Sequence, residues 1–214
     1  MSDTATVSQV EAIRSELSAL KMEVGRRMKR PERTVILIDN TNLNYTVKKV
    51  DSTGQYRLCY NKLTEYLAGD RLLRQTRIYY SDYSWNKQLE DDERAKRQDR
   101  ESFYHWLRWQ GYYLKECSLV ERDGAPKEKG LDACIIKDME RICSRDICDT
   151  LILVAGDLDY RDTVVEVQRD YCVRVEVAFF PEFAARQLQI AATKFIDLGK
   201  VKDELRRAPF QKDA

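Results

Sequence analysis

Four aspartates occupy positions where an α/β chain places catalytic groups. Asp39 directly follows the apolar run TVILI, and Asp157 and Asp159 follow the apolar run TLILVA. Asp132 lies at the start of the helical pattern that precedes the second run. If the two runs are neighbouring parallel strands, their carboxyl ends meet at one edge of the sheet, where ligands bind in such folds. The sequence therefore predicts that the four side chains converge at that edge.

Converging carboxylates repel one another, and a cleft of low dielectric makes this repulsion costly unless a cation or a shared proton compensates. A ligand set made of oxygen atoms, without sulfur or histidine, suits Mg²⁺ or Mn²⁺. Such an ion polarises a phosphoryl oxygen, lowers the pKa of a bound water and neutralises charge during an in-line displacement. The chemistry predicted for this cluster is phosphodiester hydrolysis.

Each acid also has a structural explanation. Asp157 or Asp159 can serve as a helix N-cap, and Asp132 in a first helical turn interacts favourably with the helix dipole. Asp39 can make a hydrogen bond to the next loop. Gly156 between the strand and these acids is expected to permit a tight turn. The joint placement of the acids, more than any one of them, favours a shared site.

The elements that must position these acids alternate along the chain. Strands are predicted at residues 34–39, 77–81, 112–116, 150–155, 173–178 and 194–198. Helices are predicted at residues 60–68, 86–110, 131–145, 161–170 and 183–192. Continuous apolar runs such as TLILVA fit buried parallel strands, and strict alternation implies a parallel sheet with helices on both faces.

A separate amphipathic helix is predicted before the first strand. Its apolar residues recur at steps of three and four: Val10, Ile13, Leu17, Leu20 and Val24. Two to three heptads are short for an independent coiled coil, so the stripe either packs on its own domain or forms a homo-oligomer.

Several polar residues are predicted to contact substrate. Asn40, Thr41 and Asn42 offer hydrogen bonds beside Asp39, and Lys129 precedes a glycine near Asp132, where it either meets a phosphate or is a solvated loop lysine. The secondary phosphate candidates are Lys48, Lys49, Arg26, Arg27, Lys29 and Arg30.

The long helix predicted at residues 86–110 changes from charged to apolar near its end. We expect Phe103, Trp106, Leu107 and Trp109 to anchor it to the sheet, in preference to stacking on bases. His105, the single histidine, is expected to have a packing or surface role.

Composition narrows the function classes. The chain has 214 residues and a net charge of +1, so any affinity for a polyanion must come from local patches. Six cysteines form no C-x-x-C pair and predict no zinc site. No apolar leader or run of eighteen apolar residues is present, and the expected location is cytoplasmic, without membrane contact.

Other α/β enzyme classes lack their motifs here. A phosphatase of the haloacid dehalogenase type needs a second acid where Thr41 stands, and neither a Gly-rich dinucleotide turn nor a P-loop is present. His105 has no nucleophile elbow nearby, which disfavours Ser/His/Asp hydrolysis.

Four blocks of sequence resemble the NYN family, the PIN-like nuclease domains that include the LabA-like proteins. The blocks are VILIDNTNL (residues 35–43), KEKGLDACIIKDM (127–139), DTLILVAGDLDYRDTVVEV (149–167) and FIDLG (195–199). They occur in the family's order, and each carries its acidic residue.

The resemblance implies a PIN-like three-layer fold with a central, mostly parallel sheet of five to six strands. It also implies a metal-dependent endoribonuclease that uses Mg²⁺ or Mn²⁺ on single-stranded RNA. By position, the family's acids correspond to Asp39, Asp132, Asp157 and Asp159. Asp138 matches a further family acid, but a helix turns about 240° between it and Asp132, which suits support better than ligation.

Two departures from the family pattern leave the acids intact. Leu158 stands where a small polar residue is common, and Tyr160 replaces the usual phenylalanine. An insertion at residues 47–61 is expected to form a substrate-side loop or a β-ribbon.

The predicted organisation has three parts: residues 1–32 as helix and basic linker, 33–199 as the nuclease domain, and 200–214 as a charged tail. The alternative to a nuclease is a catalytically silent RNA-binding or oligomeric scaffold protein that retains the acidic metal site.

Overall fold

The computed structural model describes residues 13–20, 30–51, 53, 55–82, 91–122, 125–128 and 130–207. The chain separates into two compact units, Met1–Pro31 and Glu32–Ala214. The second unit contains the sheet and all of the elements labelled below.

The sheet has seven strands in the order β4-β3-β2-β1-β5-β6-β7, and all but β4 run parallel. The strands are β1 (Arg33–Asp39), β2 (Leu72–Asp82), β3 (Tyr113–Arg122), β4 (Ala125–Glu128), β5 (Thr150–Val154), β6 (Arg174–Phe179) and β7 (Lys194–Asp197). The helices are α2 (Asn40–Val50), α3 (Tyr60–Ala68), α4 (Asp91–Trp109), α5 (Leu131–Ser144), α6 (Arg161–Tyr171) and α7 (Arg186–Ala191). Short 3₁₀ turns are η1 (Leu158–Tyr160), η2 (Pro181–Phe183) and η3 (Leu198–Val201).

Strand β1 is central and pairs in parallel with both β2 and β5. The strand order reverses between β1 and β5, which makes this junction the topological switch point of the sheet. The predicted pairing of the two apolar runs is therefore confirmed, and the strand ends that carry Asp39 and Asp157 are neighbours.

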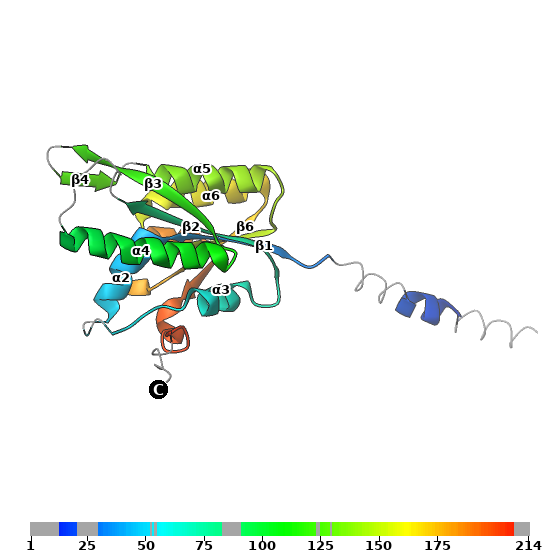
Figure 1. Cartoon of the computed structure of the whole chain (residues 1–214). Helices are drawn as coiled ribbons and strands as arrows, with labels where there is room; N and C mark the ends of the chain where they lie inside the picture. The colour runs from blue at the N-terminus through cyan, green and yellow to red at the C-terminus, as the bar shows by residue number, and fades with distance from the viewer. Residues whose placement is uncertain are drawn as a thin grey trace, which may run out of the picture. The chain divides into compact units, whose positions relative to one another are not determined.

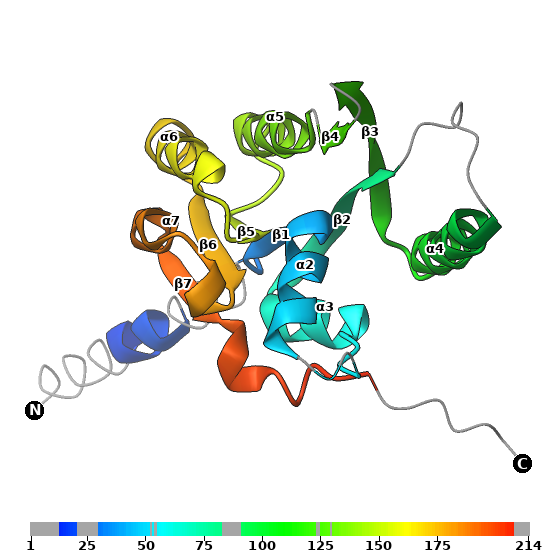
Figure 2. The ribbon, with the colours of Figure 1, turned by 90° about the vertical axis from the view of Figure 1, so that its left-hand side faces the viewer.

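Helices cover both faces of the sheet (Figure 1). Figure 2 shows α5, α6 and α7 on one side and α2, α3 and α4 on the other. Alternate residues of β1 divide between the two cores: Val35 and Leu37 pack under α5 and α6, and Ile36 and Ile38 pack under α2 and α3. Burial on both faces explains why this strand reads as a continuous apolar run.

An ion pair fixes the opposite end of the central strands. The Arg33 guanidinium, at the start of β1, donates to both carboxylate oxygens of Asp149, from Nε at 3.1 Å and from Nη2 at 2.9 Å. Because Asp149 directly precedes β5, this bidentate contact holds the register that brings the carboxyl ends of β1 and β5 together.

The predicted α/β fold with a mostly parallel sheet is confirmed, and three local features differ from the prediction or were not predicted. Of the two alternatives given for residues 47–61, a β-ribbon is not found among the described residues: α2 continues through Val50, and α3 begins at Tyr60. Strand β4, antiparallel to β3, was not predicted. The C-terminal residues through 207 are not a free tail, since Leu205 is 2% exposed and the Leu205 carbonyl accepts from the Cys59 N–H at 2.9 Å.

The anchoring of α4 also differs from the prediction. Leu107 is fully buried and Tyr104 is 8% exposed, whereas Trp106 is 37% and Trp109 is 82% exposed. The prediction is therefore confirmed for Leu107 and for the partly buried Phe103, which pack on the core together with Tyr104, and was wrong for the two tryptophans, which lie on the surface of α4.

Within the N-terminal unit, residues 13–20 form a helix whose Ile13, Leu17 and Leu20 are more than half exposed. Val10, Val24 and the basic positions 26, 27 and 29 lie outside the described residues. Among the described helices, none combines the length and the apolar character that crossing a bilayer demands.

Candidate active site

Asp39 ends β1 and caps α2. Its side chain is buried, with 3% exposed, and its Oδ1 accepts from the Asn42 N–H at 2.9 Å. The strand positions the carboxylate at the switch point, and the capping bond fixes its direction. Asp39 thus makes the predicted hydrogen bond to the following segment and also lies at the predicted edge of the sheet.

A single tyrosine hydroxyl joins Asp39 to Asp132. The Tyr160 hydroxyl lies 2.8 Å from Asp39 Oδ2 and 2.7 Å from Asp132 Oδ1. The two carboxylate oxygens are therefore no farther apart than the sum of these distances, about 5.5 Å. Asp132 lies in the first turn of α5, and Tyr160 ends η1, so three elements meet at one oxygen atom.

The proton count at this oxygen has a chemical consequence. A tyrosine hydroxyl carries one hydrogen, which satisfies one carboxylate oxygen at a time. Burial, the negative charge of Asp39 and the hydrogen bond to Asp132 raise the pKa of Tyr160 far above its ordinary value, so the hydroxyl keeps its proton. The Tyr160 hydrogen can thus be donated to only one of the two carboxylates at a time, and a cation between two neighbouring carboxylates reduces their repulsion.

Asp157 and Asp159 stand on the adjoining turn and are exposed. Asp157 caps η1, with Oδ1 accepting from the Asp159 N–H at 3.2 Å, as the N-cap explanation predicted. Within the described part of the chain, no three histidine, cysteine, aspartate or glutamate side chains gather closely enough to hold a metal ion. The structure therefore joins two of the four acids, and the joining of Asp157 and Asp159 to them stays a prediction.

Asn42 connects the turns that carry these acids. Its Oδ1 accepts from the Gly156 N–H at 2.9 Å, which ties the start of α2 to the residue before Asp157. Gly156 has no room for a side chain, because a Cβ there would lie 2.6 Å from the Phe183 carbonyl oxygen and 2.6 Å from the Phe179 ring. Close packing, and not a tight turn with positive φ, explains this glycine.

The other predicted substrate contacts have different outcomes. Asn40 is 1% exposed; its Oδ1 accepts from the Tyr60 hydroxyl, and its Nδ2 lies 3.4 Å from the Tyr104 hydroxyl. It is a buried structural residue and not a rim contact. Thr41 is partly buried and hydrogen-bonded to Ser81. Lys129 lies outside the described residues.

The comparisons with known proteins agree with this geometry. The family profile of the NYN domain matches residues 33–199, most of the chain. The chain belongs to the NYN domain family. A crystal structure of a protein of unknown function from Vibrio parahaemolyticus is similar, with a TM-score of 0.65 and 23% identity over 84% of this chain and 98% of that one. That likeness shows a shared fold, and no curated protein matches the chain.

Asp138 supports the NYN domain from the same helix as Asp132. Its carboxylate is buried and accepts from the Tyr79 hydroxyl at 2.7 Å. Arg77 Nη1 lies 3.2 Å from Asp138 Oδ2, and Lys115 Nζ lies 3.4 Å from the same oxygen. This carboxylate already has cationic partners, which fits the supporting role predicted from its place on the helix.

Sequence reasoning missed the role of Tyr160 in this NYN domain. The tyrosine was taken as a replacement that leaves the acids intact, whereas its hydroxyl contacts both Asp39 and Asp132. The available signal was a hydroxyl at a fully buried position, since such a group needs a hydrogen-bond partner.

Proposed function

We propose that this protein is a metal-dependent endoribonuclease that hydrolyses phosphodiester bonds of single-stranded RNA at Asp39, Asp132, Asp157 and Asp159. The observation that carries the proposal is the pair of carboxylates, Asp39 and Asp132, held on one hydroxyl at the switch point of the sheet. Membership of the NYN family, within the PIN-like nuclease superfamily, supports the same chemistry.

The residues fit a hard divalent cation. The side-chain atoms that meet at the acid pair, and that could bind a metal ion, are carboxylate and hydroxyl oxygens. The two carboxylates share one hydroxyl hydrogen. A Mg²⁺ or Mn²⁺ ion bound there would supply charge neutralisation and polarisation of a phosphoryl oxygen. Asp39 and Asp132 are the residues proposed to hold it.

The chain's own groups have distinct proposed roles. Tyr160 orients the buried carboxylate of Asp39 and the partly buried one of Asp132, and Asn42 keeps the turn of Asp157 against α2. Asp157 and Asp159 are exposed at the rim and are proposed to complete the cation site and to accept the proton of the attacking water. Repulsion between these acids and the RNA phosphates is the reason that the reaction requires the cation.

The first prediction concerns Asp157→Asn. Mg²⁺- or Mn²⁺-dependent cleavage of single-stranded RNA should fall by more than the roughly 10- to 100-fold that is typical of residues that only orient ligands. Because Asp157 is exposed, the fold should survive, as circular dichroism and urea unfolding can check. Gel analysis of labelled RNA with a metal titration measures the loss.

Asp162→Asn is the matched control, since Asp162 is exposed in the first turn of α6 and pairs with Arg161. Its cleavage rate should equal that of the wild type. If Asp157→Asn cleaves RNA at the wild-type rate and without added metal, the activity comes from a contaminating enzyme. RNA binding without cleavage by the wild type, at any Mg²⁺ or Mn²⁺ concentration, would instead favour a silent RNA-binding or scaffold protein.

A further inference from the structure

A groove of about 640 Å³ lies away from the acid pair, lined by α2, the segment after it, α4 and the C-terminal segment. Backbone hydrogen bonds fix one wall: the Cys59 N–H donates to the Leu205 carbonyl at 2.9 Å, and the Arg207 N–H donates to the Arg57 carbonyl at 2.7 Å. The groove is therefore built into the domain.

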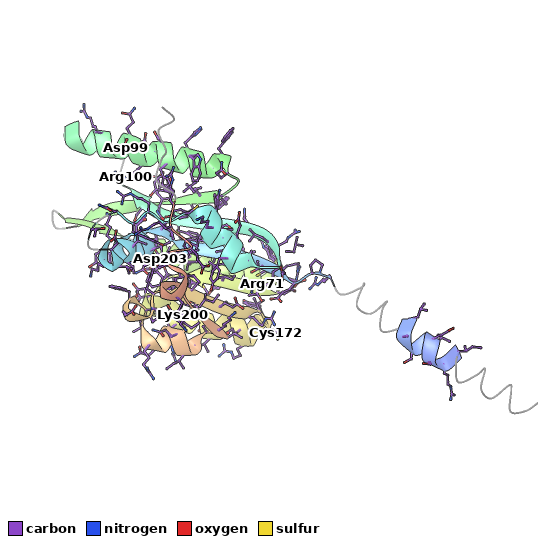
Figure 3. The ribbon with its side chains drawn as sticks, turned by 90° about the horizontal axis from the view of Figure 1, so that it is seen from below. Arg71, Asp99, Arg100, Cys172, Lys200 and Asp203 are labelled. Carbon is purple, nitrogen blue, oxygen red and sulfur yellow. The ribbon has the colours of Figure 1, made fainter. Side chains whose placement is uncertain are left out.

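The charge of this groove favours an anion. Four cationic side chains line it, Lys48, Arg57, Arg100 and Arg207, against two acidic ones, Asp51 and Asp99. Figure 3 shows Asp99 and Arg100 on α4, seen from the side on which α3 and the C-terminal segment lie. The lining residues therefore carry a formal excess of two positive charges, on a chain whose net charge is +1.

A row of aromatic rings leads out of the groove along α4. Phe103, in the groove, lies 5.6 Å from the buried Tyr60 ring and 6.3 Å from the Trp106 ring, centroid to centroid. The Arg207 guanidinium lies 5.9 Å from the Trp106 ring. Trp109, one helical turn after Trp106, is 82% exposed. The row therefore ends in an exposed tryptophan ring, and Arg207 places a positive charge over Trp106, which suits a ligand that is both anionic and aromatic.

We infer that the groove and the two tryptophans bind a single strand of nucleic acid. Phosphates meet the cationic residues, and unpaired bases stack on the exposed Trp109 and against the open edge of the row at Trp106, the combination that single-strand binding surfaces use. A duplex does not satisfy this surface, because its base faces are covered by neighbouring base pairs.

The groove is linked to the acid pair through α2. Tyr60, which lines the groove, donates its hydroxyl to Asn40, the residue directly after Asp39. The eleven residues of α2 span about 16 Å, so one strand lying along this helix reaches from the acids to the groove. The inference deepens the proposed function, on which it rests for RNA as the nucleic acid.

Binding is tested with the full chain by fluorescence anisotropy, using a labelled twelve-nucleotide oligouridylate in EDTA to suppress cleavage. The variant Trp106→Ala with Trp109→Ala should bind at least about fivefold more weakly, the loss expected for one stacked base. Lys48→Ala with Arg207→Ala should weaken binding and flatten its dependence on salt, because fewer counterions are released.

Tyr171→Ala and Arg145→Ala are the matched controls, an exposed aromatic on α6 and an exposed cation after α5, on the opposite face of the sheet. Both should bind as the wild type does, and circular dichroism should show every variant folded. Unchanged affinity in the tryptophan variant overturns the inference. The inference is also overturned if only Lys48→Ala with Arg207→Ala loses affinity, and loses it equally for heparin and for RNA. That result would indicate a site that binds anions without contacting bases.

The outcomes separate this inference from the proposed function. If the wild-type protein binds RNA through the groove but does not cleave it, the inference about the groove is supported and the proposed nuclease function is contradicted. If Asp157→Asn abolishes cleavage but the groove variants bind RNA as the wild type does, the proposed nuclease function is supported and the inference about the groove is overturned.

Discussion

At the residue scale, the Tyr160 hydroxyl decides the state of the acid pair. Tyr160→Phe should destabilise the protein in EDTA by about 1–3 kcal/mol, because the one hydrogen that the buried hydroxyl donates to the acid pair is lost. Added Mg²⁺ should recover more stability in this variant than in the wild type, since a cation can compensate the charges that the hydroxyl no longer faces. Urea unfolding with and without Mg²⁺ measures both effects.

Tyr112→Phe provides the comparison for this prediction. The Tyr112 hydroxyl donates to Asn61 Oδ1 at 2.7 Å, so its removal costs a hydrogen bond to a neutral amide. Its loss of stability should not depend on Mg²⁺. If the stability lost in Tyr160→Phe likewise does not depend on Mg²⁺, the Tyr160 hydroxyl has only a structural role.

The sequence placed Asp39 correctly and Asn40 wrongly, although the two residues are neighbours. Asp39 was identified because it ends a buried apolar run, and strand direction then determines which edge it occupies. Asn40 follows it with equal polarity but is buried against two tyrosines, because α2 begins at once and turns its side chain inward. Gly156 was explained by turn geometry, whereas its neighbours Phe179 and Phe183 come from a distant strand and turn that no local pattern reveals.

At the element scale, β1 and β5 were predictable and α2 was not. A strand that is buried on both faces leaves a continuous apolar run, which the sequence displays directly. Helix α2 has the sequence NTNLNYTVKKV, with several β-branched residues and asparagines of low helix propensity. The Asp39 cap and burial of Leu43 and Val47 stabilise it, and both depend on the tertiary fold.

Helix α5 offers an element-scale prediction through Asp138, which joins it to β2 and β3. Asp138→Asn should destabilise the domain by about 2–4 kcal/mol at neutral pH, because Arg77 and Lys115 lose a buried partner. The lower half of that range is expected, since the two cationic side chains are 17% and 28% exposed. Urea unfolding measures the difference, and Glu140→Gln, an exposed acid on α5, should change little.

The same carboxylate makes the stability depend on pH. Burial alone would raise the pKa of Asp138, but the Tyr79 hydrogen bond and the charges of Lys115 and Arg77 hold that pKa below its usual value. A depressed pKa stabilises the fold above the unfolded value of about 4, and the contribution is lost as the pH falls below 4 through the folded value. The stability difference between wild type and Asp138→Asn should therefore shrink between pH 5 and pH 3; a constant difference would contradict the assignment.

At the scale of the whole molecule, charge and apolar surface are unevenly distributed. The chain is nearly neutral, yet one groove gathers four cationic side chains and the adjacent helix exposes two tryptophans. The sequence displayed these residues but not their surroundings, because Lys48, Arg100 and Arg207 come from distant parts of the chain. The tryptophans were assigned to the core because aromatic residues at helical spacing usually pack inward, whereas α4 packs through Leu107, as predicted, and through Tyr104.

The N-terminal unit supports a last prediction at this scale. Ile13, Leu17 and Leu20 recur at steps of four and three and form an apolar stripe on the helix of residues 13–20, and we propose that this stripe is an interface between copies of the chain. Deleting residues 1–28, or introducing Ile13→Glu with Leu17→Glu, should lower the oligomeric mass measured by light scattering. Ser15→Glu adds a charge away from the stripe and should leave the mass unchanged. Equal masses for all of these proteins would mean that the stripe is not an interface between copies and would favour its packing on the same chain.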